Sequence, residues 1–553
     1  MKEVKDLLIV GAGPAGLAAA VQAARDGISL TLVSAGAPGG LLRAARSIKN
    51  LPGFPAGVSG AGLAELMASH ARGFGVTQVH AWVESLRRVD GAYEWRTACG
   101  MAGAARAVIL ATGTSPSGFD LPVPAGAGAN VHRDPTTMPS DLIGMSVIVI
   151  GGGEAALDGA LTVTDRGGMA TVLVRGAAVK ATKRLGCEAM DAGVKVVCGA
   201  DVRGLSMARS GGLEVEFVLC GEGRTLGADH LLVATGRTPC DGLWRGVAGG
   251  LGLPGDVRSG VAGVFTAGDL IRGGDRFAAT AVGDGQRAAR LALEYLKMPV
   301  PEVISTRGAP DVASVFVARM RPGDDTSMVE FVDGLDTALP REEKWIANLS
   351  TQYGCPVGCV FCDSGHRYYG NLTAGEMLGQ LAYIMGRHPG VAARCGKFKV
   401  HFARMGEPAL NDAVLETIGR LRGFTAAPNV WACVATVAPA GREEWFRRLF
   451  DAKEDGFRGR FQLQFSMNTT DEGERAAMMP VSLMPFEWIS GYIRRFHRDG
   501  DRKAVLNFAL ASGSQFSAAR IMSLFSPETS AVKVTPLNPT AAGVRSGMDT
   551  VLR

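Results

Sequence analysis

The sequence predicts an α/β protein made of two bodies, a doubly wound body followed by a parallel βα barrel, and three observations support this. The chain has 553 residues, several times the usual size of one domain. From Asp6 to about Lys297, short β-branched runs alternate with Ala-rich amphipathic stretches and Gly-rich connections. From Trp345 to Pro539, apolar runs again alternate with helical stretches, as in a parallel βα barrel.

The composition is that of a globular protein rather than of a fibrous or secreted one. Hydrophobic residues make up 47% of the chain and charged residues 20%, and the 75 glycines show no Gly-X-Y period. The 10 cysteines are too scattered for a secreted disulfide framework, and a net charge of +5 is too small to indicate nucleic-acid binding. Met1–Gly16 leaves no room for a signal peptide, and no apolar run is long enough to span a membrane. We therefore expect a cytoplasmic protein with no membrane partner.

Two glycine turns follow predicted strands in the first half. Leu7–Val10 leads into Gly11-Ala-Gly13-Pro-Ala-Gly16 and a helix, and Ser146–Ile150 leads into Gly151-Gly-Gly153-Glu-Ala-Ala156 and a second helix. Glycines let the backbone approach a pyrophosphate, which then lies on the N–H groups at the positive end of the helix. One such turn is weak evidence, because it can simply pack a strand on a helix. Two of them about 140 residues apart predict two dinucleotide sites.

Further motifs follow in a fixed order: Pro38-Gly-Gly40, Asn50-Leu-Pro-Gly53, Ala111-Thr-Gly113, Ala234-Thr-Gly236-Arg237, Gly263-Val-Phe-Thr-Ala-Gly268-Asp269 and Ala281-Val-Gly-Asp-Gly285. In this order and spacing the first half resembles the low-molecular-weight thioredoxin reductases and their ferredoxin/flavodoxin–NADP reductase relatives. The resemblance implies a Rossmann-like flavoprotein, with an FAD domain of residues 1–114 and 240–297 and an inserted NAD(P)H domain of residues 115–239. By that match FAD would be held by Gly11, Gly13, Gly16, Gly40, Asn50, Gly113, Gly268 and Asp269, and the pyridine nucleotide by Gly151, Gly153 and Ala156. We also expect a homodimer formed through this half.

Basic residues follow the second glycine turn. The predicted strand Thr171–Val174 ends in Arg175 rather than in an acid, and Lys180, Lys183 and Arg184 follow. A carboxylate at that place would bind a ribose 2′-OH, whereas a cation suits a 2′-phosphate. The sequence therefore favours NADPH over NADH, with Arg175 and Lys180 as contacts; a solvated basic helix start is the alternative.

The first half departs from the family where electrons would leave the flavin. Thioredoxin reductases place a Cys-x-x-Cys pair shortly before the second glycine turn, and this chain has no cysteine between Cys99 and Cys187. We therefore expect no dithiol that attacks the flavin and passes electrons to a disulfide. Leu41 and Phe277 stand where the family has glutamines near the flavin, and Ser34 stands where many relatives have an acid for the ribose. The flavin could still accept hydride, but its electrons need another route.

Residues 298–344 are predicted to join the two bodies. Met298–Asp311 holds three prolines and few apolar residues, which is typical of a linker. Val312–Val317 and Ser327–Val332 flank the turn at Arg321–Asp325 and predict a hairpin. The second body is expected over residues 345–541, followed by a short tail of residues 542–553. Its predicted strands are Trp345–Ser350, Lys399–Phe402, Val430–Thr436, Arg460–Met467, Ala504–Leu510 and Ala531–Pro536.

Three of the cysteines, Cys355, Cys359 and Cys362, form the pattern C-x3-C-x2-C. Thiolates this close together on one loop can bind three irons of a cubane cluster and leave the fourth iron open. Zinc is the alternative, since His366 follows closely. A further cysteine or histidine at zinc-finger spacing is absent, however, so the pattern favours iron–sulfur over zinc.

The motifs around the triplet extend the pattern: Ser350-Thr-Gln-Tyr-Gly-Cys355, Cys362-Asp-Ser-Gly365, Gly370-Asn-Leu-Thr-Ala-Gly-Glu376, Met405-Gly-Glu-Pro408-Ala-Leu-Asn411, Phe465-Ser-Met-Asn468 and Pro536-Leu-Asn-Pro539. They resemble the RlmN/Cfr-type radical S-adenosylmethionine (SAM) RNA adenine methyltransferases. The resemblance implies a partial (β/α)6 radical SAM barrel with a [4Fe-4S] cluster on the three cysteines. Gly406 and Glu407 would meet the amino group of SAM, and Ser466 and Asn538 its ribose or carboxylate; a surface-loop acid is the alternative for Glu407. One electron would then cleave SAM to a 5′-deoxyadenosyl radical.

The second half also lacks residues by which its relatives act. Those enzymes methylate through two further cysteines, and one of these positions is Asn348 here, while no cysteine follows Cys433. Their N-terminal RNA-binding module is missing as well. We therefore do not expect RNA methylation by their mechanism. Cys395 and Cys433 lie in no matching motif and are expected to be small buried residues.

Together the halves predict an NAD(P)H-dependent flavoprotein oxidoreductase fused to a radical SAM enzyme. NADPH would reduce FAD, electrons would pass to the [4Fe-4S] cluster, and the radical made from SAM would act on an unidentified small molecule, peptide or nucleobase. NADPH is a weaker reductant than most such clusters need, so a small electron carrier is a candidate partner. The alternatives are a flavin oxidoreductase whose cluster domain is a relay or structural module, a flavin-dependent thiol oxidase whose barrel tailors the same product, and RNA adenine modification by a route without cysteines.

Overall fold

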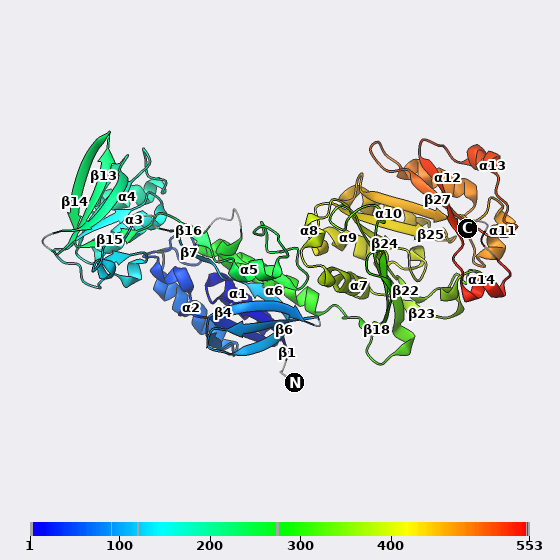
Figure 1. Cartoon of the computed structure of the whole chain (residues 1–553), viewed down its shortest axis with the longest axis horizontal. Helices are drawn as coiled ribbons and strands as arrows, with labels where there is room; N and C mark the ends of the chain where they lie inside the picture. Colours follow the sequence, from blue (N-terminus) through cyan, green and yellow to red (C-terminus); the bar gives the residue numbers. More distant parts are fainter. Residues whose placement is uncertain are drawn as a thin grey trace. The chain divides into compact units, whose positions relative to one another are not determined.

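The computed structural model describes residues 4–89, 91–118, 121–208, 211–271, 276–548 and 550, without the side chain of His366. The chain forms two compact units (Figure 1). The first comprises Met1–Val247, Leu253–Val257 and Gly263–Leu293, and the second comprises Ala248–Gly252, Arg258–Ala262 and Glu294–Arg553. Within the described ranges, no helix combines the length and the apolar character that crossing a membrane requires.

The first unit contains a seven-stranded sheet in the order β3-β2-β1-β6-β5-β4, with β17 paired to β6. Its strands are β1 (Val4–Val10), β2 (Leu30–Ser34), β3 (Gln78–His80), β4 (Val83–Val89), β5 (Ala92–Thr97), β6 (Ala102–Leu110) and β17 (Val264–Thr266). Strand β1 pairs in parallel with β2 and β6, and its residues Leu7–Ile9 are fully buried, as expected for a central parallel strand. The helices of this part are α1 (Pro14–Arg25), α2 (Gly60–Gly73), α5 (Gly242–Val247) and α6 (Ala278–Leu296), with short helices η1 (Gly40–Ala44) and η4 (Gly268–Leu270).

A second parallel sheet lies between β6 and β17 in the sequence. Strands β7 (Thr114–Pro116) and β16 (Arg237–Pro239) pair with each other where the chain enters and leaves this part. The sheet has the order β11-β10-β9-β15-β8, and an antiparallel sheet β12-β13-β14 lies between its strands β11 and β15 in the sequence. Its elements are β8 (Val131–His132), β9 (Ser146–Ile150), α3 (Glu154–Asp165), β10 (Met169–Val174), α4 (Lys183–Asp191), β11 (Lys195–Cys198), β12 (Asp201–Met207), β13 (Leu213–Leu219), β14 (Glu222–Ala228) and β15 (His230–Val233), with short helices η2 (Gly128–Asn130) and η3 (Pro135–Thr137).

The second unit is built on one nine-stranded sheet in the order β18-β19-β20-β21-β24-β25-β26-β27-β28. The first three strands, β18 (Glu302–Ala309), β19 (Ala313–Arg319) and β20 (Met328–Leu335), are antiparallel, and β20 pairs antiparallel with β21 (Trp345–Leu349). From β21 onwards the strands are parallel and follow chain order: β24 (Phe398–Phe402), β25 (Val430–Thr436), β26 (Phe461–Ser466), β27 (Ala504–Leu510) and β28 (Ser530–Pro536). All six strands predicted for this body are present within two residues of their predicted ends.

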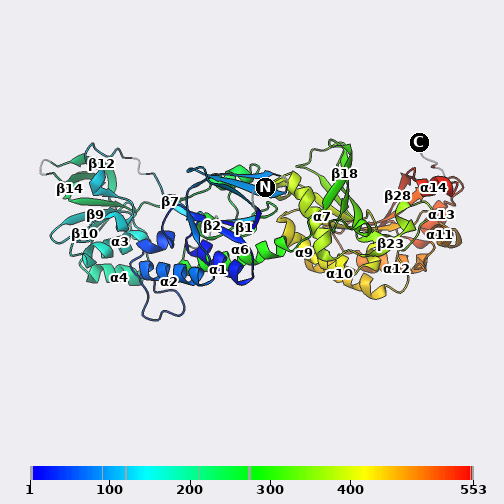
Figure 2. The same cartoon turned by 90° about the horizontal axis from the view of Figure 1, so that it is seen from below.

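Helices cover one face of the parallel strands, as Figure 2 shows for α9, α10 and α12. The helices are α7 (Ala374–Arg387), α8 (Val391–Arg394), α9 (Ala413–Thr425), α10 (Glu443–Gly456), α11 (Glu472–Met478), α12 (Phe486–Phe496), α13 (Ala518–Leu524) and α14 (Ala541–Arg545). A short ribbon of β22 (Gln352–Gly354) and β23 (Tyr368–Asn371) and the short helices η5 (Asp325–Ser327), η6 (Asp363–His366) and η7 (Pro408–Leu410) complete the unit. The parallel strands arise from the predicted alternation, and the identification of this sheet with a radical SAM barrel stays a prediction.

Two segments differ from the sequence-based expectation. Strand β18 lies inside the predicted linker at Met298–Asp311, where it pairs with β19 through backbone hydrogen bonds. Most of its side chains are exposed, so the apolar alternation that predicts a strand is missing there. In the predicted tail, residues 542–545 belong to helix α14, whose first turn is capped by the side chain of Thr540.

Candidate functional site

The first glycine loop joins β1 to α1 and leaves open space in front of the helix. Gly11 has a φ of 104°, and a Cβ there would collide with the carbonyl oxygen of Ala111, so only glycine fits. A Cβ added at Gly13 would meet no atom within 4 Å, and no side chain caps the N-terminus of α1. The first N–H groups of α1 are therefore free to bind an anion in this space.

Other predicted residues gather at this loop. A Cβ at Gly40 would lie 3.4 Å from the Cα atom of Gly13, and one at Gly268 would lie 2.9 Å from the Cβ atom of Ala15. Next to Gly268, burial raises the pKa of Asp269, partly offset by the charges of Arg276 and Arg237. The structure thus brings Gly11, Gly13, Gly16, Gly40, Gly268 and Asp269 together.

For two further residues predicted for this site, none of the described contacts joins them directly to that group. Gly113 has a φ of 63°, and its carbonyl oxygen accepts a hydrogen bond from the N–H of Cys240 at 2.9 Å. Asn50 is exposed in a bend, and none of the described contacts joins it to the first glycine loop. Both assignments stay predictions.

The second glycine loop repeats this geometry between β9 and α3. Gly151 has a φ of 146°, no side chain caps α3, and a Cβ at Gly153 would meet no atom within 4 Å. The N–H of Lys180 donates to the carbonyl oxygen of Gly152 at 2.6 Å, which brings this lysine to the loop. Arg175 follows β10 at the same end of the sheet. Both cations are exposed, and neither makes an ion pair in the described part of the chain, so both remain available to an anionic ligand.

A charged cluster that the sequence does not reveal contacts α3 and α4 in the first unit. The N–H of Arg46 donates to Asp158 Oδ2 at 2.8 Å, and its guanidinium binds Asp165 and Glu188 at 2.5 and 2.8 Å. Lys49 reaches the second oxygen of Glu188 at 2.8 Å. Arg46 and Lys49 precede α2 and lie far from their partners in the sequence, so neither periodicity nor a motif could indicate these pairs.

The three cysteines of the second unit lie on the loop between β22 and η6. The N–H of Cys362 donates to the carbonyl oxygen of Cys359 at 3.0 Å, so the loop turns back on itself. Thr540 closes the loop from the other side, because its hydroxyl donates to the carbonyl oxygen of Phe361 at 2.6 Å. This geometry brings the three thiols close together: in addition to burial, the charge of Cys362 raises the pKa of Cys355, and the charges of Cys355 and Cys362 raise the pKa of Cys359.

The surroundings of the cysteines are apolar. Val357, Val437, Met478 and Met479 form a buried cluster against Cys355 and Cys359. Burial raises the pKa of Cys355 to about 11, and burial raises that of Cys359 further. The thiols of Cys355 and Cys359 are therefore neutral at pH 7 unless a cation binds them, and a coordinated metal ion reverses that preference. No group of three His, Cys, Asp or Glu side chains among the described residues is arranged to hold a metal ion, and the side chain of His366 is outside the described part.

Glu407 is buried beside the cysteine loop, where its side chain joins its own loop to the end of β25. Its carboxylate accepts hydrogen bonds from Thr436 Oγ1 at 2.5 Å, from the N–H of Val437 at 2.8 Å and from the N–H of Ala409 at 2.9 Å. Burial raises the pKa of Glu407 to about 7, although these three hydrogen bonds act to lower it. Both carboxylate oxygens of Glu407 therefore already accept hydrogen bonds from the protein.

The backbone beside Glu407 packs directly on β22. The N–H of Glu407 donates to Gln352 Oε1 at 2.8 Å, and the N–H of Thr351 donates to the carbonyl oxygen of Met405 at 2.8 Å. Gly406 has a φ of 94°, and a Cβ there would lie 2.6 Å from the Cβ atom of Gln352, so the close approach requires glycine. Ser466 ends β26 and Asn538 follows β28, at the carboxyl ends of parallel strands. The predicted SAM residues therefore share one end of the sheet with the Met405–Glu407 segment.

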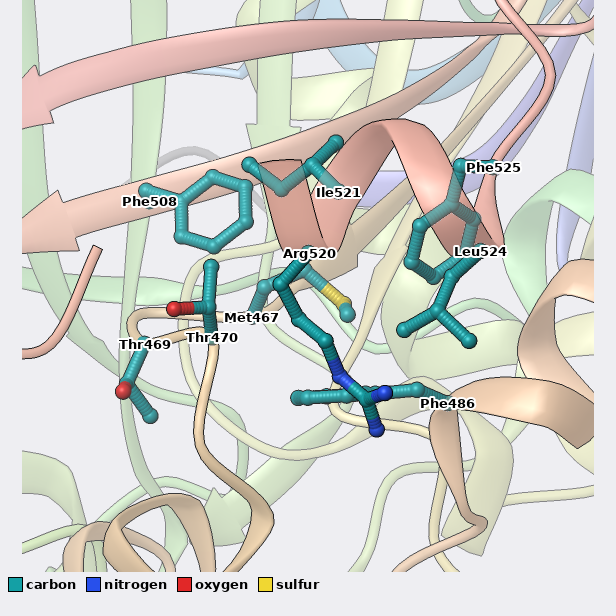
Figure 3. Close-up of a pocket in the computed structure, with 9 residues that line it drawn as sticks. All are labelled: Met467, Thr469, Thr470, Phe486, Phe508, Arg520, Ile521, Leu524 and Phe525. Atoms are coloured by element: carbon teal, nitrogen blue, oxygen red, sulfur yellow. The ribbon is translucent and has the colours of Figure 1, made fainter. Parts of the chain in front are cut away.

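One small pocket lies elsewhere in the second unit (Figure 3). Its walls are apolar apart from Thr469, Thr470 and Arg520. Figure 3 shows the side chain of Arg520 reaching beside Phe486. The volume open to a water-sized sphere is about 10 Å³, roughly the room that a single water needs. This pocket therefore does not hold a substrate.

Comparisons with known proteins concern the first half of the chain. Residues 5–285 match the family model described as pyridine nucleotide-disulphide oxidoreductase. A thioredoxin reductase of Treponema pallidum is 30% identical over 300 residues, which are 53% of this chain and 97% of that protein. A bifunctional thioredoxin reductase/thioredoxin of Mycobacterium leprae is 32% identical over 302 residues, 53% of this chain and 66% of that protein. The crystal structure of Lactococcus lactis thioredoxin reductase is 25% identical, with a TM-score of 0.49, and covers 53% of this chain and 99% of that one.

Proposed function

The chain belongs, over residues 5–285, to the pyridine nucleotide-disulphide oxidoreductase family, and we propose that this half supplies electrons to a radical SAM reaction in the second unit. The first half is a thioredoxin reductase-like oxidoreductase domain that depends on FAD and NAD(P). The radical SAM assignment rests on the cysteine loop and its surroundings.

The two glycine loops fit the two dinucleotides. At each loop the glycines exclude side chains, and the uncapped N–H groups of α1 or α3 face open space. Gly11, Gly13, Gly16, Gly40, Gly268 and Asp269 would hold FAD, with Asn50 and Gly113 beside it, and Gly151, Gly153 and Ala156 would hold the pyridine nucleotide. When bound, FAD would supply the ability to take a hydride from the pyridine nucleotide and release its electrons singly.

The pyridine nucleotide is NADPH in this proposal. Arg175 and Lys180 are exposed cations at the second glycine loop, and no carboxylate of the described residues neutralises them. A 2′-phosphate would take both as partners, whereas the 2′-OH of NADH needs a carboxylate that this end of β10 does not offer.

Electrons need an exit other than a dithiol. The chain has no cysteine between Cys99 and Cys187, and Cys187 is exposed on α4. This chain therefore lacks the thiol pair that thioredoxin reductases place before the second glycine loop, and that disulfide reduction in their manner requires. Three cysteines in the second unit offer a different acceptor.

The cysteine loop fits an iron–sulfur cluster. Its donor set is three soft thiols on one loop, and the apolar surroundings of Cys355 and Cys359 mean that these two would ionise only on binding a cation. Cys355, Cys359 and Cys362 would hold the cluster, and Gly406 with the backbone of Glu407 would position the amino group of SAM. Ser466 and Asn538 would contact the rest of that ligand. When bound, a [4Fe-4S] cluster with SAM would supply a 5′-deoxyadenosyl radical.

The single observation that carries the proposal is the spacing of the three partly buried cysteines beside the Met405–Glu407 segment. The test is anaerobic reconstitution with iron and sulfide, followed by SAM with either NADPH or dithionite and chromatography of 5′-deoxyadenosine. We expect both reductants to give 5′-deoxyadenosine. Product with dithionite alone would show that the flavoprotein half does not feed the cluster, and no product with either would exclude radical SAM chemistry.

A second candidate function follows from the extent of the family match. Residues 286–553 lie outside the matched range, and the described cysteines do not form a single-ion metal site. An NAD(P)H-dependent oxidoreductase whose cysteine loop carries a relay or structural cluster would have these features as well. Flavin turnover with NADPH and an artificial acceptor, in the absence of any SAM cleavage, would identify this alternative.

A further inference from the structure

The parallel strands of the second unit leave one face open, and that face is polar. Helices bury the other face, whereas most residues on the open face are only partly covered, although Lys399 and Cys433 among them are buried. Parallel sheets are normally buried on both faces by apolar side chains, so an open polar face is unusual. The polar residues on it are Asn348, Lys399, His401, Gln462, Gln464, Ser466, Asn507 and Lys533, with Cys433 among them.

The register of the strands places these side chains next to one another. Asn348 pairs with His401, His401 pairs with Cys433, and Cys433 pairs with Gln462 across four neighbouring strands. Further along, Asn507 pairs with Lys533. Side chains of directly opposed residues on one face lie close together. The open face is therefore one continuous surface rather than a set of separate polar residues.

Positive charge gathers where the strands of this face begin. Lys397 Nζ lies 4.1 Å from the ring centre of Trp431, and the Arg502 guanidinium lies 5.8 Å from the same ring. Lys399 is opposite Trp431 in the sheet and donates to Gln462 Oε1 at 2.6 Å. Lys344 is also near, but Asp336 neutralises it. No ion pair of Lys397, Lys399, Arg502 or Lys533 occurs among the residues that the structure describes.

These cations repel one another. Burial lowers the pKa of Lys399, and the charges of Arg502, Lys397 and Lys344 lower it further. Burial and the charges of Arg502 and Lys344 lower the pKa of Lys397 in the same direction. An anion bound between Lys397, Lys399 and Arg502 would remove the repulsion, since charge-assisted hydrogen bonds to oxyanions are the strong ones.

Two atoms on the same face are buried without a partner. His401 Nε2 and Asn507 Oδ1 are closed to solvent, and neither has a hydrogen-bond partner. Burial and the charge of Lys399 lower the pKa of His401 to about 3, so its ring is neutral and can donate or accept one hydrogen bond at each nitrogen. A buried polar atom left unpaired is destabilising, and a ligand with complementary hydrogen-bonding groups would satisfy both atoms.

The charged end and the cysteine-loop end of the face are well separated. Strand β25 runs from Trp431, beside the cations, to Thr436, which hydrogen-bonds Glu407. Five residues at roughly 3.3 Å each give about 16 Å between the two ends. A bare inorganic anion cannot span that length, whereas an elongated small molecule can.

We propose that the open face binds the substrate of the radical reaction, and that this substrate is a small molecule with a phosphate or carboxylate group. Lys397, Lys399 and Arg502 hold the oxyanion, and His401 and Asn507 hydrogen-bond an uncharged part of the molecule nearer the cysteine loop. The proposal rests on the proposed function, because it assigns the substrate class of that same site.

The test measures anion binding without turnover. Pyrophosphate and citrate are titrated calorimetrically into the reconstituted full chain in the presence of saturating NADP⁺, which fills the 2′-phosphate site of the first unit. Tighter binding of pyrophosphate identifies a phosphate ligand, and tighter binding of citrate identifies a carboxylate. We expect Lys399→Gln combined with Arg502→Gln to weaken the preferred anion at least about tenfold.

Two controls separate charge loss from misfolding. Lys399→Arg with Arg502→Lys keeps both charges and is expected to bind within about threefold of the wild type. Arg447→Gln removes a cation from the exposed surface of α10, where it pairs with Glu444 and Asp451, and is expected to change nothing. Iron content and unfolding temperature show whether each variant folds.

Equal anion binding by the wild type, the double glutamine variant and Arg447→Gln would overturn the proposal. So would tighter binding of a single-stranded oligoribonucleotide than of either small anion, lost in the same double variant, because the face would then bind nucleic acid. Formation of 5′-deoxyadenosine with dithionite is measured in parallel. If the wild type forms no 5′-deoxyadenosine, the result counts against the proposed function. If it forms 5′-deoxyadenosine but the double glutamine variant binds anions as the wild type does, the result counts against the substrate class alone.

Discussion

The glycine loops of the first unit and the cysteine loop of the second prepare their sites in opposite ways. At Gly11 and Gly151 the site depends on the absence of side chains, because glycine leaves the space before α1 and α3 open and no side chain caps their N–H groups. At the cysteine loop the site consists of side chains, and burial keeps the thiol of Cys355 neutral until a cation binds. The first kind of site is formed before its ligand arrives, whereas the second is completed by its ligand. Substitutions should therefore affect the two halves through different mechanisms.

The largest expected effect is loss of the cluster. Cys359→Ala removes one of three soft ligands from the loop, so we expect iron content and 5′-deoxyadenosine formation to fall below about 1% of the wild type. The flavin spectrum and its reduction by NADPH should stay unchanged. Cys395→Ala is the matched control, because Cys395 is a buried cysteine of the same unit outside the loop. Full iron content in Cys359→Ala would show that the three cysteines do not act together.

The reverse experiment removes the flavin and leaves the cysteine loop intact. Gly11→Ala forces a Cβ against the carbonyl oxygen of Ala111 at a φ of 104°, so we expect a loss of about 3 kcal/mol in the first unit and almost no bound FAD. Gly27→Ala is the control, since Gly27 has a φ of 74° but its Cβ would meet nothing within 4 Å. Flavin absorbance and iron content are measured on the same samples. Similar flavin loss in both variants would mean that backbone strain alone, rather than the close approach, decides the site.

The second unit should also respond to acid through Asp333. Burial alone would raise the pKa of Asp333, but hydrogen bonds from His388 and Trp345 and the charge of Arg341 hold it below the usual 3.8. Because the folded pKa is the lower one, its contribution to stability is full above pH 3.8 and is lost as the pH falls through the folded pKa. Asp333→Asn should lower the free energy of unfolding by about 3 kcal/mol at pH 7. The free energy of unfolding of this variant should also fall less steeply than that of the wild type as the pH drops below 3.8.

The control for this prediction is Asp325→Asn. Asp325 is exposed and pairs with Arg319, so its loss should cost less than about 1 kcal/mol. Denaturant unfolding followed by tryptophan fluorescence reports on both variants, while flavin absorbance follows the first unit separately. A pH dependence that is unchanged in Asp333→Asn would show that other carboxylates control the acid unfolding.

The smallest expected effect concerns the choice of pyridine nucleotide. Arg175→Gln with Lys180→Gln should raise the KM for NADPH about tenfold and leave that for NADH unchanged, because only the 2′-phosphate needs these charges. Arg203→Gln, on β12 and paired with Asp201, is a control for general loss of positive charge. An equal rise in the KM for NADPH and the KM for NADH would place the two cations outside the 2′-phosphate site.

The fold of both halves could largely be predicted from the sequence, because regular apolar runs determine most of it. Strands β21, β24, β25, β26 and β27 are largely buried and follow apolar runs that are visible in the sequence, whereas β18 is an exposed strand held by backbone pairing and has no such pattern. The glycine loops could be located because their motifs are local. The ion pairs of Arg46 could not be, since they join residues more than a hundred positions apart.

The role of Glu407 shows a similar limit. Its motif suggested a ligand contact, but the partners that occupy its carboxylate, Thr436 and Val437, come from the next strand and its following loop. The open polar face was equally hidden, because Lys399, His401 and Gln462 look like interruptions of apolar runs until the register places them side by side. Long-range pairing of this kind depends on tertiary structure that local patterns do not encode.

One measurement tests most directly whether the first half serves the second. Anaerobically reconstituted protein is mixed with NADPH, without SAM or any added carrier, and frozen for electron paramagnetic resonance. We predict that NADPH produces the signal of a reduced cluster in the wild type and that flavin-free Gly11→Ala gives none, while dithionite gives the signal in both. A cluster that dithionite reduces but NADPH leaves oxidised would contradict the account, because the two halves would then be joined in sequence without exchanging electrons.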